Sequence, residues 1–142
     1  MCTVTNWSPL PRPLTTGMPL PLSRKVVPVW VPSGSWLAEQ GHQVEDHGCH
    51  GLESCDYADF CEPAARAVAE GKCERGIVIC TTGIGASITA NKVKGVRCAL
   101  CSEPWSAQMT RRHNDANVLA LGAGITGPLM ARQIVEAFLS FQ

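Results

Sequence analysis

Short apolar runs alternate with amphipathic stretches from residue 42 to the end of the chain. The continuous apolar runs at 76–80 and 117–122 have the length expected of buried strands, and two shorter strand-like stretches lie at 42–48 and 95–101. Between and after them, apolar residues recur at helical spacing and predict helices at 56–72, 85–93, 104–115 and 127–141. Short apolar strands that alternate with helices predict an α/β fold with a mostly parallel sheet covered on both faces.

Helix-ending and helix-starting residues support these boundaries. Ser35 is a candidate cap for a short helix that Gly41 would end, and Gly71 would end the helix at 56–72. Pro104 suits the first turn of the helix at 104–115. The apolar side of the last helix is expected to comprise Leu129, Ile134, Val135, Phe138 and Leu139.

The first 35 residues differ from the rest in composition and in hydrophobic pattern. They contain seven of the ten prolines and follow neither a strand nor a helix period. The only strand-like piece is 25–31, and Pro28 in its middle limits it to a sheet edge. We therefore expect two parts, an atypical, poorly ordered Pro-rich segment at 1–35 and an α/β domain at 36–142. The sheet would then lack its first strand or have a poor substitute for it.

Composition excludes several classes of protein. Twelve basic and twelve acidic residues balance, so no charge excess favours nucleic acid. No apolar run reaches the ~18 residues of a membrane span, and the first thirty residues lack the pattern of a signal peptide. Eight cysteines in a chain without an export signal favour reduced thiols over a disulfide scaffold. The sequence thus predicts a soluble cytoplasmic protein.

The turn after Cys80 is the strongest candidate for chemistry. Gly83 and Gly85 allow a sharp turn from strand to helix, and the unpaired amides at that helix start suit an anion such as a phosphate or an enediolate. The same field favours the thiolate form of a cysteine at the strand tip. The alternative is a buried cysteine beside a turn in which glycine serves only packing.

Other clusters favour structural interpretations. Cys98 and Cys101 resemble a metal or redox pair, but residues three apart on a strand face opposite sides of the sheet, so core packing is preferred. The group at 42–61 lacks the ligand spacing of structural zinc sites, and no metal is expected; its members are His42, His47, Cys49, His50, Cys55 and Cys61. His113 could transfer protons near neutral pH or simply lie on the surface.

The stretch GIVICTTGIGASITANKVKGVRCALCSEPWSAQMTRRHNDANVLALGAGITG at 76–127 resembles the type B ribose-5-phosphate isomerases, a family that includes the galactose-6-phosphate isomerase subunits. The resemblance runs from about Trp36 to the C-terminus. DYADF at 56–60 resembles the family's substrate-side tyrosine segment, with Tyr57 as the tyrosine. The family implies a Rossmann-like three-layer fold with about five strands. It also implies a homodimer, or a dimer of dimers, with the active site shared between chains.

The resemblance implies aldose–ketose isomerisation through an enediol, as in the pentose phosphate pathway, with no cofactor. Cys80 would move the proton between C2 and C1, Thr82 would hydrogen-bond the reacting oxygens, and His113 would open the sugar ring. Asn114 would contact the substrate. Backbone amides would hold the enediolate in the segment of Thr81, Gly83, Ile84 and Gly85.

Departures from the family pattern leave a second hypothesis open. Residues 1–35 offer no counterpart of the family's first substrate-binding strand, and Thr81 stands where a glycine is usual. Gly124 replaces an arginine expected to bind phosphate, and many members continue beyond the position of Gln142. The chain is thus either an isomerase of ribose 5-phosphate and ribulose 5-phosphate, or a weak or inactive member that binds a phosphosugar or pairs with an active homologue. A galactose-6-phosphate isomerase subunit is a further alternative, and a nucleotide-binding module fits the incomplete glycine pattern poorly.

Overall fold

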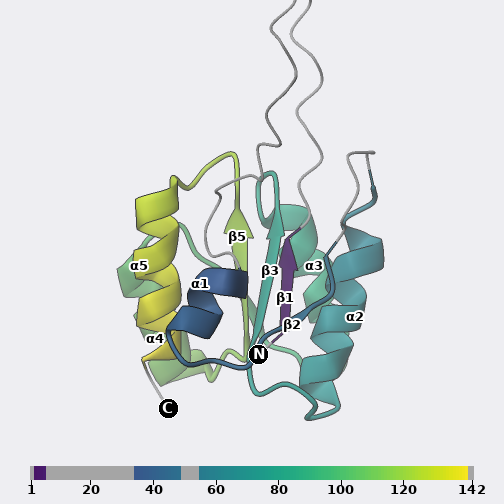
Figure 1. The fold of residues 1–142 in the computed structure, drawn as a ribbon. Helices are drawn as coiled ribbons and strands as arrows, with labels where there is room; N and C mark the ends of the chain where they lie inside the picture. Colours follow the sequence, from purple (N-terminus) through teal and green to yellow (C-terminus); the bar gives the residue numbers. More distant parts are fainter. Residues whose placement is uncertain (1, 6–33, 49–54, 141–142) are drawn as a thin grey trace, which may run out of the picture.

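A five-stranded parallel sheet forms the centre of the protein, in the order β2-β1-β3-β5-β4 (Figure 1). The computed structural model describes residues 2–5, 34–48 and 55–140, to which all structural statements below refer. The strands are β1 (Cys2–Thr5), β2 (Glu45–Asp46), β3 (Gly76–Cys80), β4 (Cys98–Leu100) and β5 (Val118–Gly122).

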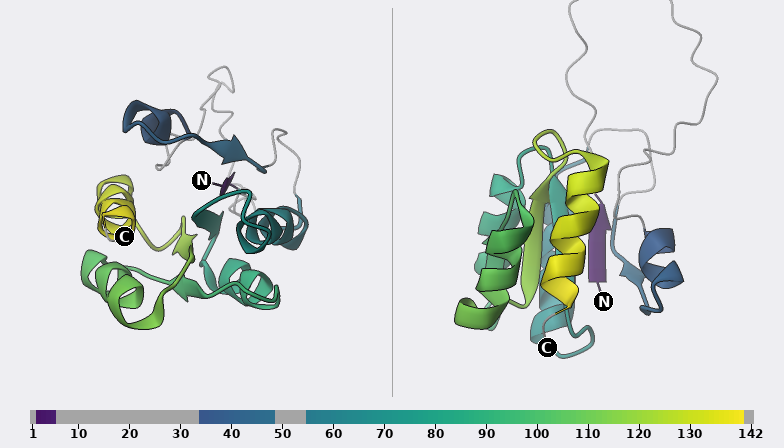
Figure 2. Two further views of the ribbon diagram at one scale, coloured as in Figure 1. Left: turned by 90° about the horizontal axis from the view of Figure 1, so that it is seen from below. Right: turned by 90° about the vertical axis from the view of Figure 1, so that its left-hand side faces the viewer.

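Helices cover both faces of the sheet, which confirms the predicted three-layer α/β architecture (Figure 2). One layer contains α2 and α3, which pack against each other, and the other contains α1, α4 and α5. The helices are α1 (Gly34–Glu39), α2 (Ala58–Ala69), α3 (Ile84–Asn91), α4 (Pro104–Asn114) and α5 (Pro128–Leu139).

Alternation along β3 divides the core between these two layers. All five residues of β3 are buried, because both faces of the strand are covered. Val78 and Cys80 belong to the cluster under α2 and α3, whereas Ile77 and Ile79 belong to the cluster under α4 and α5. The last residue of β3 therefore directs its side chain toward the α2–α3 layer, at the carboxyl edge of the sheet.

The structure differs from the sequence-based expectation at the first strand. Residues 1–35 were expected to offer only 25–31 as a strand-like piece, and that piece lies outside the described residues. Cys2–Thr5 instead forms β1, parallel to both β2 and β3. A four-residue strand is too short to show a period in the sequence, and its hydrogen-bond partners lie more than forty residues away, beginning with Glu45. The sheet thus has the predicted number of strands, with a different first strand.

The predicted helices are confirmed, with one exception on α5. Leu129 was expected on the buried side of this helix but is 77% exposed. It lies in the first turn of α5, which follows the loop after β5, so it stands beyond the end of the sheet. The buried side consists of Ala131, Ile134, Val135 and Phe138. The short helix α1 also begins at Gly34, one residue before the predicted cap.

Candidate active site

Cys80 ends β3 at the carboxyl edge of the sheet, and the turn to α3 follows at once. Its side chain is almost fully buried, with 7% of the residue exposed. The Gly83 amide donates a hydrogen bond to the Cys80 sulfur over 3.1 Å. The predicted strand–turn–helix arrangement around Cys80 is therefore present.

Gly83 is required by this turn for two reasons. It precedes α3 with φ +78°, a left-handed conformation that residues with a Cβ rarely adopt. A Cβ at Gly83 would also stand 2.8 Å from the carbonyl carbon of Leu121 and would collide with Leu100. The turn after Cys80 is thus pressed against the end of β5, and only glycine fits there.

The loop after β5 holds the turn from the other side. The Ala123 amide donates to the Cys80 carbonyl, and the Gly124 amide donates to the Thr81 carbonyl, both over 2.8 Å. A Cβ at Gly122 would stand 2.5 Å from the Thr82 carbonyl oxygen. The backbones of the two loops therefore touch. The sequence analysis missed this role of the Gly122–Gly124 segment, although closely spaced glycines after a buried strand were its signal.

The amides at the start of α3 already have partners inside the turn. The Ile84 amide donates to the Thr82 hydroxyl over 3.3 Å, and the Gly83 amide donates to Cys80. Ser87 donates its hydroxyl to the Ile84 carbonyl over 2.8 Å. The side chains of Cys80 and Thr82 thus occupy the amides of Gly83 and Ile84, two of the donors that were predicted to hold an oxyanion.

Tyr57 joins this site from the residue before α2. A Cβ at Gly85 would stand 2.6 Å from the Tyr57 hydroxyl oxygen, so the phenol ring lies directly against the backbone of Gly85. Tyr57 is 40% exposed. Its hydroxyl therefore stands at the rim of the turn, and the absence of a side chain at Gly85 makes the contact possible.

His113 and Asn114 lie at the opposite edge of the sheet. They are the last two residues of α4, and the chain then reaches the start of β5 at Val118. The Asn117 carbonyl accepts the Gly76 amide over 3.0 Å, at the start of β3. The end of α4 is therefore level with the amino ends of the strands. Within one chain the structure brings Cys80, Thr81, Thr82, Gly83, Ile84, Gly85 and Tyr57 together, but not His113 or Asn114.

Cys98 and Cys101 pack into the two separate cores, as the alternation rule predicts. Cys98 packs against the cluster under α2 and α3, whereas Cys101 belongs to the cluster under α4 and α5. Burial raises the pKa of both thiols. They therefore cannot bind one metal ion together, and both are inert packing groups.

The oxidation state of the cysteines differs from the expectation of reduced thiols at Cys73. Cys55, Cys61, Cys80, Cys98 and Cys101 carry thiols that form no disulfide. Cys73 takes part in a disulfide. The predicted reduced state is thus wrong at Cys73. Of the histidine and cysteine group at 42–61, Cys49 and His50 lie outside the described residues; elsewhere in 34–48 and 55–140, no three His, Cys, Asp or Glu side chains are placed to hold a metal.

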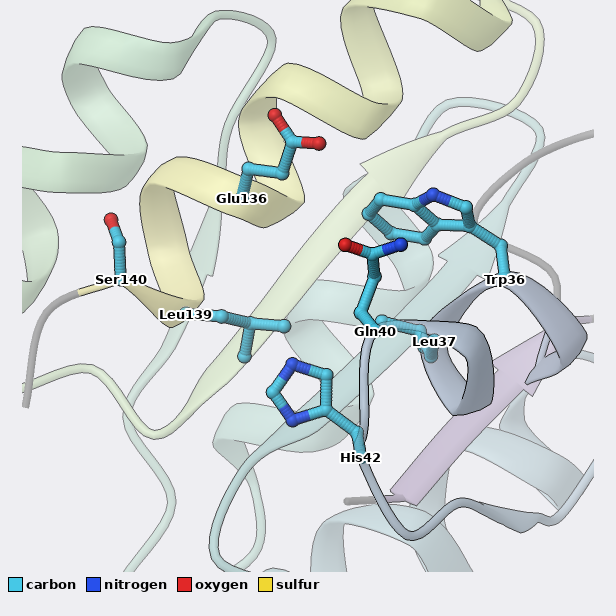
Figure 3. A pocket seen from close by; sticks show the side chains of 7 residues that line it. All are labelled: Trp36, Leu37, Gln40, His42, Glu136, Leu139 and Ser140. Atoms are coloured by element: carbon cyan, nitrogen blue, oxygen red, sulfur yellow. The ribbon is translucent and has the colours of Figure 1, made fainter.

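A separate hollow lies between α1 and α5, on the other face of the sheet (Figure 3). Trp36, Gln40 and His42 line it from the α1 side, and Glu136, Leu139 and Ser140 line it from α5. None of the predicted site residues contributes to it. Among the described residues, every helix falls short of the length and apolarity that a bilayer crossing requires.

Comparison with known proteins identifies the family. A family model described as Ribose/Galactose Isomerase matches residues 34–142. Ribose-5-phosphate isomerase B of Escherichia coli is 48% identical over 106 residues, which cover 75% of this chain and 71% of the relative. D-erythrulose-4-phosphate isomerase of Pectobacterium atrosepticum is 43% identical over 105 residues, which cover 73% and 69%. The structure of ribose-5-phosphate isomerase B of Clostridium thermocellum superposes with a TM-score of 0.74 at 50% identity, over 76% of this chain and 73% of that one.

The chain belongs to the ribose/galactose isomerase family, a family of sugar-phosphate isomerase enzymes. This confirms the resemblance seen in the segment around Cys80. The family model begins at residue 34, where α1 begins.

Proposed function

We propose that the protein interconverts ribose 5-phosphate and ribulose 5-phosphate, with Cys80 as the proton-transferring base. The observation that carries this proposal is the position of the Cys80 sulfur, buried at the strand tip with the Gly83 amide donating to it over 3.1 Å. A thiolate held by an amide is a suitable base for a carbon acid, because the donor stabilises its charge without occupying all of its lone pairs.

The reaction transfers one proton between two carbons. Cys80 removes the proton from C2 of the open-chain aldose, and the electron pair moves to the C1 carbonyl oxygen to form an enediolate. The same sulfur returns the proton to C1 while a proton passes from O2 to O1, which yields the ketose. The Thr82 hydroxyl, which accepts the Ile84 amide within the same turn, would guide the proton between the two oxygens.

The turn offers the enediolate a set of donors that are already oriented. The amides of Gly83 and Ile84 now point at side chains of the same turn, and an oxyanion of the substrate would take the place of these acceptors. Thr81 and Gly85 complete the turn, and the Tyr57 hydroxyl stands at its rim against Gly85. No cofactor is needed for this chemistry.

A second copy of the chain would complete the site. His113, the proposed group for ring opening, and Asn114 end α4 at the edge of the sheet opposite to Cys80. Exposed apolar side chains on α3, β4 and α4 support an interface that begins at the Cys80 edge of the sheet: Ile84, Ile88, Leu100 and Trp105. Leu100 also contacts the Gly83 turn, so this surface continues into the site. Two antiparallel chains related by a twofold axis through this surface would bring His113 of one chain toward Cys80 of the other.

The alternative is a weak or inactive family member, and Gly124 favours it. No side chain at this position can reach a phosphate, and a Cβ there would stand 3.1 Å from the Thr81 carbonyl oxygen and 3.3 Å from its methyl carbon. Charge-assisted contacts are among the strongest that a phosphate can receive, so a missing cation raises KM. A galactose-6-phosphate isomerase subunit is a further alternative.

An isomerase assay on the purified full chain tests the proposal. Ribose 5-phosphate, galactose 6-phosphate and D-erythrulose 4-phosphate are offered in turn, and the formation of the isomer is followed by coupled detection, with Cys80→Ala as the control. Turnover of ribose 5-phosphate that Cys80→Ala abolishes supports the proposal. Folded protein, shown by circular dichroism, that turns over none of the three at millimolar concentration refutes it and leaves the non-catalytic alternative.

A further inference from the structure

Cys61 is a second buried thiol near the site, and the proposed reaction does not use it. It lies in the first turn of α2 and is fully buried, with 0% exposed. It carries a free thiol. A free cysteine in a packed core can be merely a small apolar residue, so its surroundings decide whether it does more.

The topology places Cys61 at the same edge of the sheet as Cys80 and in the helix layer that the Cys80 side chain faces. Cys80 directs its side chain toward the α2–α3 layer, and the first turn of α2 lies at the same carboxyl edge of the sheet because helices run against the parallel strands. Both residues belong to one packed cluster. The Cys61 amide also donates to the Tyr57 carbonyl over 2.9 Å, and the Tyr57 ring lies against Gly85 of the Cys80 turn. The same few residues therefore hold both cysteines.

The two sulfurs differ in their electrostatic surroundings. Cys80 receives an amide hydrogen bond, whereas burial and then the charge of Cys80 raise the pKa of Cys61 to about 12. Cys61 is fully buried as a protonated thiol, whereas Cys80 lies at the turn with 7% of the residue exposed, so Cys80 is the sulfur that an oxidant can reach first. In redox-sensitive sites, one cysteine is oxidised to a sulfenic acid, and a neighbouring resolving cysteine then forms a disulfide with it. Cys80 and Cys61 fit these two roles.

We propose that Cys80 and Cys61 form a reversible oxidation site, in which a peroxide oxidises Cys80 and Cys61 then closes a disulfide with it. The loss of isomerase activity on oxidation rests on the proposed function of Cys80. The formation of the disulfide does not.

Besides the two cysteines, the only reactant that the chemistry needs is a peroxide. The Cys80 thiolate attacks one oxygen of hydrogen peroxide, the O–O bond breaks, and a sulfenic acid and hydroxide result. The Cys61 thiol then attacks this sulfur, the S–O bond breaks, and the disulfide and one water molecule form. A dithiol reductant cleaves this disulfide and restores both thiols. While the disulfide is present, it protects Cys80 from further, irreversible oxidation.

Peptide mapping of the full chain tests the disulfide directly. The protein is treated with hydrogen peroxide, alkylated, and digested with trypsin and chymotrypsin without reduction. Cys61 then lies in residues 61–66 and Cys80 in 76–92, and neither peptide contains another cysteine. We expect these two peptides linked, and separated by dithiothreitol. Untreated protein gives the baseline, because Cys73 is already in a disulfide.

A disulfide requires Cβ atoms within about 4.5 Å of each other. The linked peptide thus also tests the geometry. Its absence, with Cys80 recovered as a sulfinic acid or as the alkylated thiol, overturns the proposal whether or not the protein is an isomerase.

Two matched variants test the consequence for activity. In wild-type protein, dithiothreitol should restore most of the activity lost to peroxide. In Cys61→Ala the recovered fraction should fall about tenfold, because sulfinic acid accumulates on Cys80. Cys98→Ala, which removes a thiol packed against the same core cluster, should recover like wild type. Equal recovery in all three proteins contradicts the protective role of Cys61.

Discussion

At the scale of single residues, the site depends on the absence of side chains as much as on their presence. Gly83, Gly85 and Gly122 each stand where a Cβ would meet another part of the chain within 3 Å. They let the turn after Cys80 pack against the end of β5 and against Tyr57. The glycines were predicted to allow a sharp turn, but the sequence carries no signal of which distant residues approach them.

Gly83→Ala should therefore destabilise the protein and disrupt the turn. The left-handed conformation alone costs a residue with a Cβ about 1–2 kcal/mol, and the collision with Leu121 and Leu100 adds to it. We expect the free energy of unfolding, measured in urea, to fall by more than about 2 kcal/mol. Gly71→Ala is the control, since Gly71 has φ +74° but no atom within 4 Å of an added Cβ. An equal loss in both variants would contradict the steric argument.

Cys80→Ala should remove the proposed base without unfolding the chain. We expect kcat for ribose 5-phosphate to fall about 10³-fold while KM changes little, because the sulfur acts in the transition state. Steady-state kinetics and a thermal melt separate loss of function from loss of fold.

Iodoacetamide offers a check on the thiolate that does not depend on a substrate. It should label Cys80 before Cys61 and Cys98, whose thiols burial holds in the protonated form. Faster labelling of Cys98 would exclude a thiolate at Cys80.

At the scale of elements, the buried strands were the easiest to predict and the short ones the hardest. Gly76–Cys80 was predicted to the residue, because a strand buried on both faces is a continuous apolar run. The strand predicted at 42–48 is present only as Glu45–Asp46, and Cys2–Thr5 was not predicted, because four residues beside the Pro-rich stretch show no recognisable period. The pairing of these strands depends on partners far along the chain.

The same distinction applies to the candidate site. The turn after Cys80 could be predicted because its residues are consecutive. The contacts of Tyr57 with Gly85 and of Gly124 with Thr81 join separate elements and could not.

Both ends of α4 are fixed by side chains. At its start, the Glu103 carboxylate accepts the amides of Trp105 and Ser106, both over 2.7 Å. At its end, Arg111 donates to the Ala116 carbonyl and lies 5.7 Å from the ring of Phe138 on α5. These contacts hold both ends of the helix that carries His113.

The cap at Glu103 predicts a pH dependence. Hydrogen bonds from the Ser106 hydroxyl and then from the backbone amides of Ser106 and Trp105 lower the pKa of Glu103 below its ordinary value of 4.5. The carboxylate therefore stabilises the fold above pH 4.5, and this contribution is lost as the pH falls through the lowered pKa. Glu103→Gln should be less stable than wild type at neutral pH, and the difference should shrink at a pH below the folded value. Urea unfolding at the two pH values measures it; a difference that grows on acidification would contradict the cap.

At the scale of the whole molecule, one chain holds its proposed catalytic groups at opposite edges of the sheet. Cys80 ends β3, and His113 ends α4 beside the amino ends of the strands. The exposed apolar side chains of Ile84, Leu100 and Trp105 lie at the carboxyl edge, because these residues begin α3, end β4 and begin α4, and Ile88 follows one turn further along α3. Under the proposed function, a single chain has no complete active site, and activity requires two associated chains. Experiments on variants in solution can test this requirement.

Mixing two inactive variants should restore activity. If each site takes Cys80 from one chain and His113 from the other, a mixed dimer of Cys80→Ala and His113→Ala contains one intact site. After unfolding and refolding an equal mixture, about a quarter of wild-type activity is expected from random pairing in a twofold dimer. Activity no higher than that of the separate variants would show that the site is not shared.

Disrupting the apolar surface should separate the chains. Trp105 is 65% exposed, so Trp105→Glu adds a charge without disturbing the core. We expect a shift toward monomer in analytical ultracentrifugation and a parallel loss of activity, because a buried interfacial carboxylate without a partner is costly. Gln133→Glu on the exposed side of α5 serves as the control for the added charge. An unchanged dimer would place the interface elsewhere.

The position of β1 also affects the order in which the sheet can form during protein synthesis. Its backbone pairs with Glu45 on one side and with Gly76 on the other, so β1, which precedes the other four strands in the chain, lies in the interior of the sheet. Cys2 can meet Gly76 only after more than seventy further residues have been made, and contacts so distant along the chain form slowly. During synthesis, β1 therefore stays unpaired with β3 until Gly76 and the residues after it have been made. The sheet cannot form strand by strand in the order of synthesis.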